Sequence, residues 1–181
     1  MTEQKKAIFL DRDGVINKEV NYLSDPDEFE LLEGTAEALK LLKEQNYLLI
    51  VITNQSGLAR GYFTEETLSD IHNKMKRLLK EKGVKLDDIF YCPHHPKFTG
   101  ECSCRKPKPG MILNAQDKYK IDLKRSYMVG DTLSDIKAGK NAGCKTVFVL
   151  TGHGSEEQAE IDSVNPDFIY PNLLEFAKNL K

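Results

Sequence analysis

The sequence predicts an α/β fold: a Rossmann-like, doubly wound and mainly parallel sheet. Short apolar runs alternate with amphipathic segments along the 181 residues, as in βα units that surround a parallel sheet. The run over residues 47–52 is almost wholly apolar and β-branched, which is typical of a central parallel strand. Polar residues directly follow several of these runs, at the strand ends where open α/β sheets bind ligands.

Six apolar runs are expected to form the strands. They are residues 7–10, 47–52, 88–91, 126–129, 146–150 and 168–170. Helices are expected from Thr35 to about residue 45, from Thr64 to Gly83, from Pro109 onward, over 132–141 and over 173–180. Thr35 is expected to cap its helix, and Thr64, with two glutamates after it, is expected to start the other. The apolar side chains of these two helices lie at helical spacing: Ala38, Leu39 and Leu42 in one, and Leu68, Ile71, Met75 and Leu78 in the other.

The composition suits a soluble globular protein, with 40% hydrophobic and 30% charged residues. A net charge of -2 provides no field for gathering nucleic acid. No apolar run approaches the ~20 residues of a membrane span, and the first residues lack the apolar segment of a signal peptide. The chain is therefore expected to form one domain over residues 1–181. The protein is expected to be a cytoplasmic monomer and to have no nucleic-acid or membrane partner.

Asp11 and Asp13 follow the first predicted strand. Alternate side chains of extended backbone point the same way, so these two carboxylates can face one locus. Like charges at so short a distance repel each other unless a proton or a metal cation holds them together. The alternative reading is a simple turn at the Asp-Gly pair.

Three later strand ends or loops carry complementary groups. Residues 53–57 offer hydroxyl, amide and backbone N–H donors for an anion, with an ordinary turn as the alternative. Lys106 lies in a basic segment ahead of a helix, with a solvated loop as the alternative. Asp131 ends a strand and Asp135 lies one helical turn further on. For Asp135, stabilisation of a helix N-terminus is the alternative to direct catalysis.

Together these groups predict phosphoryl transfer through an aspartyl-phosphate. Asp11, Asp13 and Asp131 are oxygen ligands of the kind that Mg²⁺ prefers. Thr53 and Lys106 can donate to a phosphoryl group. A carboxylate nucleophile, an acid–base partner, Mg²⁺ and a lysine are the components that this chemistry needs, because the metal offsets repulsion between the nucleophile and the phosphate.

A second cluster of ligands lies in a loop over about residues 92–104 and predicts a structural zinc site. A Cys-x-His pair and a Cys-x-Cys pair each place two ligands on one side of an extended strand, so four ligands can converge tetrahedrally. This spacing selects His94 over His95, and four protein ligands leave no open position for catalysis. The alternative is a set of free thiols and turn residues. The predicted ligands are Cys92, His94, Cys102 and Cys104.

Four segments resemble the four motifs of the haloacid dehalogenase-like hydrolase superfamily: residues 9–14, 53–57, 105–107 and 130–135. More narrowly, they are similar to the D-glycero-D-manno-heptose 1,7-bisphosphate 7-phosphatases and to their relatives, the histidinol-phosphatases. The resemblance covers about residues 7–152. These motifs are much more specific than a lone glycine pattern.

The resemblance implies that Asp11 accepts the phosphoryl group and that Asp13 protonates the leaving alcohol and then activates water. Thr53 and Lys106 would stabilise the phosphoryl group, and Asp131 would complete the Mg²⁺ site. The resemblance also implies zinc on the four ligands of residues 92–104. It places the substrate against Glu19, Val20, Asn21, Tyr22, Asn54, Gln55, Ser56, Arg105 and Thr132.

Two of these substrate assignments carry a qualification. A solvated flap is the alternative for Glu19 and Val20. At Thr132, some heptose phosphatases carry a lysine that helps to hold the substrate, and the sequence leaves open how a second phosphate is bound without that cation.

Members of this superfamily often carry a separate cap domain. About forty residues separate Asp11 from Thr53, and the segment from Thr53 to Lys106 already holds a helix, a strand and the zinc loop. Neither interval has room for a further domain of ~50 residues. A capless protein is therefore expected, in which the zinc loop and residues 18–25 shape substrate access.

The leading hypothesis is Mg²⁺-dependent removal of the 7-phosphate of D-glycero-D-manno-heptose 1,7-bisphosphate, a small phosphorylated sugar. The alternative is a histidinol-phosphatase or another phosphomonoesterase of the superfamily. A third hypothesis is an inactive, zinc-stabilised interaction protein, which predicts loss of a catalytic carboxylate that this sequence retains. The sequence leaves the sugar anomer open.

Overall fold

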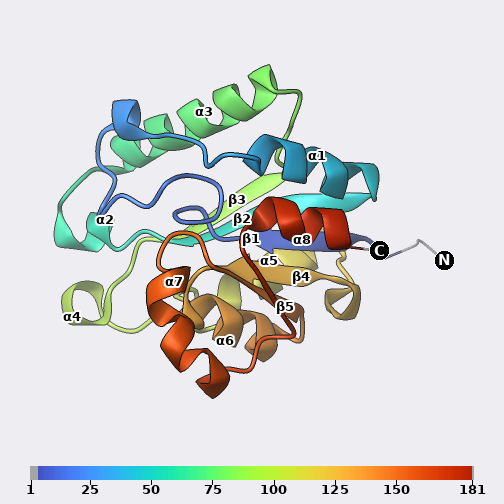
Figure 1. Cartoon of the computed structure of the whole chain (residues 1–181). Helices are drawn as coiled ribbons and strands as arrows, with labels where there is room; N and C mark the ends of the chain where they lie inside the picture. Colours follow the sequence, from blue (N-terminus) through green and yellow to red (C-terminus); the bar gives the residue numbers. More distant parts are fainter. Residues whose placement is uncertain (1–3, 181) are drawn as a thin grey trace.

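A computed structural model describes residues 4–180 of the chain, so the expectation about the first three residues lies outside the described part. Six strands form one parallel sheet in the order β3-β2-β1-β4-β5-β6 (Figure 1). This is a doubly wound order, as predicted. The strands are β1 (Lys6–Leu10), β2 (Tyr47–Asn54), β3 (Asp88–Cys92), β4 (Tyr127–Gly130), β5 (Lys145–Val149) and β6 (Phe168–Tyr170).

Helices cover both faces of the sheet. Neighbouring strand residues point to opposite faces: Ile8 and Leu10 of β1 pack with one group of helices, and Ala7 and Phe9 pack with the other. The first group is α1 (Thr35–Glu44), α3 (Glu65–Glu81) and α8 (Leu173–Asn179). The second is α5 (Gly110–Tyr119) and α6 (Leu133–Ala142). Figure 1 shows α1 and α3 on one side of the sheet and α6 on the other.

Short helical segments complete the described chain, and sequence periodicity did not predict them because each spans only one or two turns. They are η1 (Pro26–Glu28), α2 (Gly57–Arg60), α4 (Pro96–Thr99), η2 (Leu123–Arg125), α7 (Gly154–Glu157) and η3 (Gln158–Ser163). Among residues 4–180, no helix has the length and apolar character needed to cross a bilayer.

Two predicted helix starts have different outcomes. Thr64 caps α3, and its hydroxyl accepts a hydrogen bond from the backbone N–H of Thr67 at 3.2 Å. The prediction for Thr35 was wrong: it is the first residue of α1, and the cap is Gly34 with φ of 78°. A glycine adopts this left-handed conformation without a Cβ clash, so the chain turns into the helix one residue earlier than the threonine suggested.

Two further differences bear on the site. Strand β2 runs through Asn54, so Thr53 and Asn54 belong to the strand rather than to the loop after it. On α3, Leu79 rather than Leu78 is fully buried, and His72 shares the buried face. The apolar spacing alone did not reveal a histidine on that face.

Candidate active site

Three neighbouring strands end around one pocket. Because β1 lies between β2 and β4 in a parallel sheet, residues Asp11, Thr53 and Asp131 meet at the same edge. Lys106 joins them from the loop that precedes α5. The pocket encloses about 200 Å³. Its lining residues are Asp11, Asp13, Glu19, Val20, Asn21, Tyr22, Leu23, Thr53, Asn54, Gln55, Ser56, Gly57, Lys106, Thr132 and Ser134.

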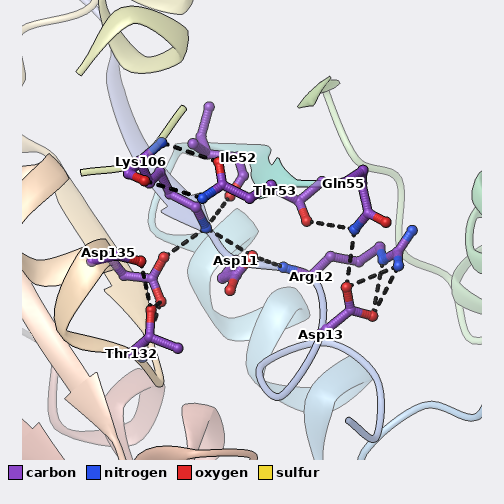
Figure 2. A network of polar contacts seen from close by, with 11 residues as sticks. Asp11, Arg12, Asp13, Ile52, Thr53, Gln55, Lys106, Thr132 and Asp135 are labelled. Carbon is purple, nitrogen blue, oxygen red and sulfur yellow. Dashed lines mark hydrogen bonds and ion pairs between the residues drawn. The ribbon is translucent and has the colours of Figure 1, made fainter. Parts of the chain in front are cut away.

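Lys106 lies between two carboxylates at the base of the site (Figure 2). Its ammonium Nζ is 2.9 Å from Oδ1 of Asp11 and 2.6 Å from Oδ1 of Asp135, and it donates a hydrogen bond to the carbonyl of Ile52 at 2.8 Å. Lys106 is only 4% exposed. Burial alone would lower its pKa, but the charges of Asp11 and Asp135 outweigh burial and raise the pKa. Lys106 therefore stays cationic at neutral pH.

The carboxylates of Asp11, Asp131 and Asp135 converge, with one oxygen of each lying within 4.8 Å of the others. Burial raises the pKa of Asp11 to about 7 and that of Asp131 to about 9, and the neighbouring carboxylates add to both shifts. Oδ1 of Asp131 is buried without a hydrogen-bond partner. An unpartnered oxygen among three buried carboxylates fits a hard divalent cation, which would favour their charged forms.

Two glycines make room for Asp131. A Cβ on Gly14 or on Gly152 would lie 2.1 Å from Oδ2 of Asp131, and both glycines have positive φ values. The same oxygen accepts a hydrogen bond from the backbone N–H of His153 at 2.8 Å. Asp131 is therefore held against two closely approaching backbone segments, and no larger residue would fit at either glycine.

The side chain of Asp13 faces a different set of groups. Arg12 donates hydrogen bonds from Nε and Nη2 at 2.8–3.1 Å, Asn17 donates at 2.9 Å, and Gln55 donates at 3.0 Å. Burial would raise the pKa of Asp13, but the Arg12 charge and these hydrogen bonds lower it. Figure 2 shows Arg12 turned toward Asp13 and Lys106 toward Asp11. The two aspartates of the first motif thus have separate partners.

Sequence reasoning did not assign a role to Arg12 or Asn17, which are 1% and 0% exposed. The available signal was an arginine and an asparagine placed around the Asp-Gly turn after a buried strand, where a buried polar side chain needs a partner. For Asp135, whose role was left open, the structure shows the contact at a helix N-terminus, while direct catalysis stays a prediction. Its Oδ2 accepts from the backbone N–H of Thr132 at the start of α6, and its Oδ1 contacts Lys106.

Most residues predicted to bind substrate line the pocket, but several also have intramolecular partners. Asn54 donates to the carbonyl of Lys106 at 3.2 Å and accepts from its N–H at 3.0 Å, which holds that loop on β2. Gln55 also donates to the Thr53 hydroxyl at 2.9 Å. Arg105 does not line the pocket; its Nη1 donates to the carbonyl of His94 at 3.2 Å. Asp131 is buried and is likewise not among the lining residues.

An arginine that sequence reasoning missed contacts Tyr22, one of the residues that line the pocket. The guanidinium of Arg60 lies 5.5 Å from the ring centroid of Tyr22 and 5.0 Å from that of Phe98. Its Nη2 is 3.2 Å from Nε2 of His95. Cation–π contacts of this kind hold the side chain in place. Arg60 of helix α2 therefore connects Tyr22, in the segment of residues 18–25, with the predicted zinc loop.

Three cysteine sulfurs of the predicted zinc loop converge. Sγ of Cys92 is 3.6 Å from Sγ of Cys102 and 2.9 Å from Sγ of Cys104. Such a set suits a soft or borderline cation such as Zn²⁺. Among the described residues, the cluster of ligand atoms within 4.8 Å of one another contains these three cysteines and does not include His94. The assignment of His94 as the fourth ligand stays a prediction.

Comparisons with known proteins agree with this geometry. Residues 103–176 match a family model described as HAD-hydrolase-like. The D-glycero-beta-D-manno-heptose-1,7-bisphosphate 7-phosphatase of Pasteurella multocida is 44% identical, over 98% of this chain and 97% of that protein. The D-glycero-alpha-D-manno-heptose-1,7-bisphosphate 7-phosphatase of Photorhabdus laumondii is 48% identical, over 86% of this chain and 88% of that protein. The crystal structure of D,D-heptose 1,7-bisphosphate phosphatase from B. bronchiseptica, complexed with magnesium and phosphate, has a TM-score of 0.90 and 40% identity over 96% of both chains.

Proposed function

This chain belongs to the haloacid dehalogenase-like hydrolases, among the heptose-1,7-bisphosphate 7-phosphatases, and on that premise we propose that it removes the 7-phosphate of D-glycero-D-manno-heptose 1,7-bisphosphate. The observation that supports this best is the convergence of Asp11, Thr53 and Asp131 at neighbouring strand ends with Lys106 from the loop before α5, beside a separately held Asp13. Such a set provides a nucleophile, an acid–base group and positive charge for phosphoryl transfer.

In the proposed reaction, a carboxylate oxygen of Asp11 attacks phosphorus and the bond from phosphorus to the sugar oxygen breaks. The pKa of Asp13 is lowered in the free protein, so Asp13 takes up a proton as the anionic substrate binds, because the phosphoryl charge disfavours a second negative charge beside it. Asp13 gives this proton to the departing oxygen, which leaves an aspartyl-phosphate on Asp11. Asp13 then takes a proton from water, the water oxygen attacks phosphorus, and inorganic phosphate leaves. Lys106 and the Thr53 hydroxyl donate to the phosphoryl oxygens as their charge develops.

Mg²⁺ is proposed at Asp11 and Asp131, with Asp135 the third carboxylate of the cluster. When bound, it would offset the repulsion between the Asp11 carboxylate and the phosphoryl dianion. The predicted participation of Asp13 as a magnesium ligand stays a prediction, because its side-chain oxygens already accept hydrogen bonds from Arg12, Asn17 and Gln55.

Zn²⁺ is proposed as a structural ion in the loop of residues 92–104, on the three converging cysteines and on His94. Arg105 follows this loop directly in the chain, so an ordered loop would fix the position of the arginine that the family resemblance assigns to substrate recognition. We further propose that the protein acts in the cytoplasm on a small phosphorylated sugar, without nucleic-acid or membrane partners, and as a monomer.

Steady-state kinetics with both anomers of the heptose bisphosphate, beside histidinol phosphate, test the proposed function. We expect the highest kcat/KM for one heptose anomer, with phosphate released from C7 and the 1-phosphate retained. A higher kcat/KM for histidinol phosphate would overturn the substrate assignment while leaving the chemistry in place. Absence of hydrolysis with any of these substrates in the presence of Mg²⁺ would overturn the proposed reaction.

A further inference from the structure

Helix α3 has one contact with the catalytic apparatus that the proposed reaction does not use. Among the described residues, none of those lining the active-site pocket belongs to α3. His72 of this helix nevertheless lies beneath the site, where its Nε2 is 3.2 Å from Nη1 of Arg12. Arg12 in turn contacts both carboxylate oxygens of Asp13 at 2.8–3.1 Å. A chain of contacts thus runs from His72 through Arg12 to Asp13.

The protonation state of His72 follows from its surroundings. The residue is 7% exposed, and burial, together with the positive charges of Arg12 and Lys76, lowers its pKa to about 3. An arginine carries a proton on every nitrogen and can only donate. Nε2 of a neutral His72 must therefore be the acceptor of this hydrogen bond, with the ring proton on Nδ1.

Arg12 connects His72 with Asp13, and its guanidinium group has little freedom to rotate. Its guanidinium is planar, so the direction of Nη1 also sets the directions of Nε and Nη2. Nε and Nη2 bind Asp13, and Nη1 binds His72. Fixing one edge of the group at His72 fixes the edge that faces the carboxylate.

Helix packing fixes His72 itself. Leu68, Ile71, Met75 and Leu79 of α3 are buried at 0–1% exposure beside it. Its ring lies 6.0 Å from the ring of Tyr91 on β3, measured between centroids. The acceptor nitrogen is therefore held by a 17-residue helix rather than by a mobile loop.

We propose that His72 is a positioning residue for the general acid: its neutral ring orients the Arg12 guanidinium, which holds the carboxyl group of Asp13 toward the leaving oxygen. This inference rests on the proposed function, in which Asp13 protonates the departing alcohol. It predicts a defect in protonation of the leaving group, with binding of the phosphate unchanged.

The test compares two leaving groups. The sugar phosphate leaves as an alkoxide that needs a proton, whereas p-nitrophenolate is a good leaving group without one. General acid catalysis supplies roughly 10²–10⁴ in rate, and we expect partial misorientation in His72→Leu to cost roughly tenfold in kcat/KM on the heptose bisphosphate. The comparison uses kcat/KM because this constant reports the steps through departure of the leaving group, whereas kcat also contains the later hydrolysis step, in which Asp13 activates water for both substrates. The kcat/KM for p-nitrophenyl phosphate is expected to change by less than about twofold.

Three further variants complete the design. His72→Gln places an acceptor oxygen close to the position of Nε2 and is expected to restore the sugar rate. His72→Asn is one methylene shorter and is expected to show the selective loss. Met75→Leu, a volume-conserving change on the same buried face, is the control and should leave both rates unchanged. Thermal unfolding verifies that each variant is folded.

A selective loss in His72→Leu that His72→Gln restores supports the inference. Equal losses on both substrates, or wild-type rates in His72→Leu, would overturn it. Should His72→Leu not fold, the comparison of His72→Asn with His72→Gln decides in the same way. Turnover of the sugar substrate by the wild-type protein is measured first, and its absence would mean that the proposed function is wrong. If the proposed function is right and this inference is wrong, the variants will show no selective change in the ratio of the sugar-phosphate rate to the p-nitrophenyl phosphate rate.

Discussion

Replacement of Lys106 by methionine should destabilise the protein and abolish most of its activity. Methionine retains much of the apolar stem of lysine but lacks the ammonium group. In the wild-type protein this group lies between two carboxylates, 2.9 Å from Oδ1 of Asp11 and 2.6 Å from Oδ1 of Asp135. Breaking a buried ion pair on one side costs roughly 3–5 kcal/mol because it leaves an uncompensated buried charge. At about 2–4 °C per kcal/mol for a chain of this size, the lower end of that range lowers Tm by roughly 6–12 °C.

The size of the effect should depend on pH. Lys106 lowers the pKa of Asp11, which is nevertheless raised to about 7 from 3.8, so its loss moves this pKa further up. A carboxyl group whose pKa is higher in the folded than in the unfolded chain favours folding at low pH, and this contribution is lost as pH rises through the folded pKa. Lys106→Met should therefore lower Tm least at pH 6, where Asp11 can take up a proton, and most at pH 9.

Thermal unfolding without added Mg²⁺ at pH 6 and pH 9 measures this directly. Lys118→Met, which removes an exposed ion pair with Asp88, is the matched control and should leave Tm nearly unchanged at both pH values. In the presence of Mg²⁺, Lys106→Met should also lower kcat/KM by roughly 10²–10³ through lost stabilisation of the phosphoryl charge. A Tm equal to that of the control, or a larger loss of Tm at pH 6 than at pH 9, would show that Lys106 does not offset the buried charges of Asp11 and Asp135.

Three other predictions address the nucleophile and the two metal sites. Asp11→Asn should remove hydrolysis and any acid-stable phosphoryl-enzyme with its fold retained; turnover at the wild-type rate would exclude Asp11 as the nucleophile. The affinity for Mg²⁺, measured by calorimetry, should rise from pH 6 to pH 9, because the cation displaces protons from the carboxyl groups of Asp11 and Asp131, whose pKa values are about 7 and about 9. Asp131→Asn should weaken Mg²⁺ binding. An affinity that does not change with pH would contradict a magnesium site at these carboxylates. Removal of zinc by a chelator, or Cys104→Ser, should lower Tm, whereas Cys144→Ala should leave zinc content unchanged; a Tm insensitive to zinc removal would argue against a structural ion.

Much of the fold could be predicted because the core strands and helices carry strong local signals. The run of residues 47–52 has no polar residue to oppose a buried strand, and Thr64 with the two glutamates after it has the composition of a helix start. Thr35 was assigned wrongly because a capping threonine and the first residue of a helix differ only in backbone angles, which Gly34 determined. The short helices α2 and α4 span four residues each, which is too short for helical periodicity to show in the sequence.

Local sequence pattern was enough to find the residues that could supply the chemistry: two aspartates after a strand, a later aspartate at another strand end, a threonine and a lysine. Their proximity could also be expected, since the carboxyl ends of parallel strands share one edge. The pairing of the charges became visible only in the folded structure. It turns Asp11 toward Lys106 and Asp13 toward Arg12, brings Asp135 into the carboxylate cluster, and places His72 against Arg12 across 60 residues of sequence. Pairing of buried charges depends on distances of a few ångströms between separate elements, and no local pattern contains those distances.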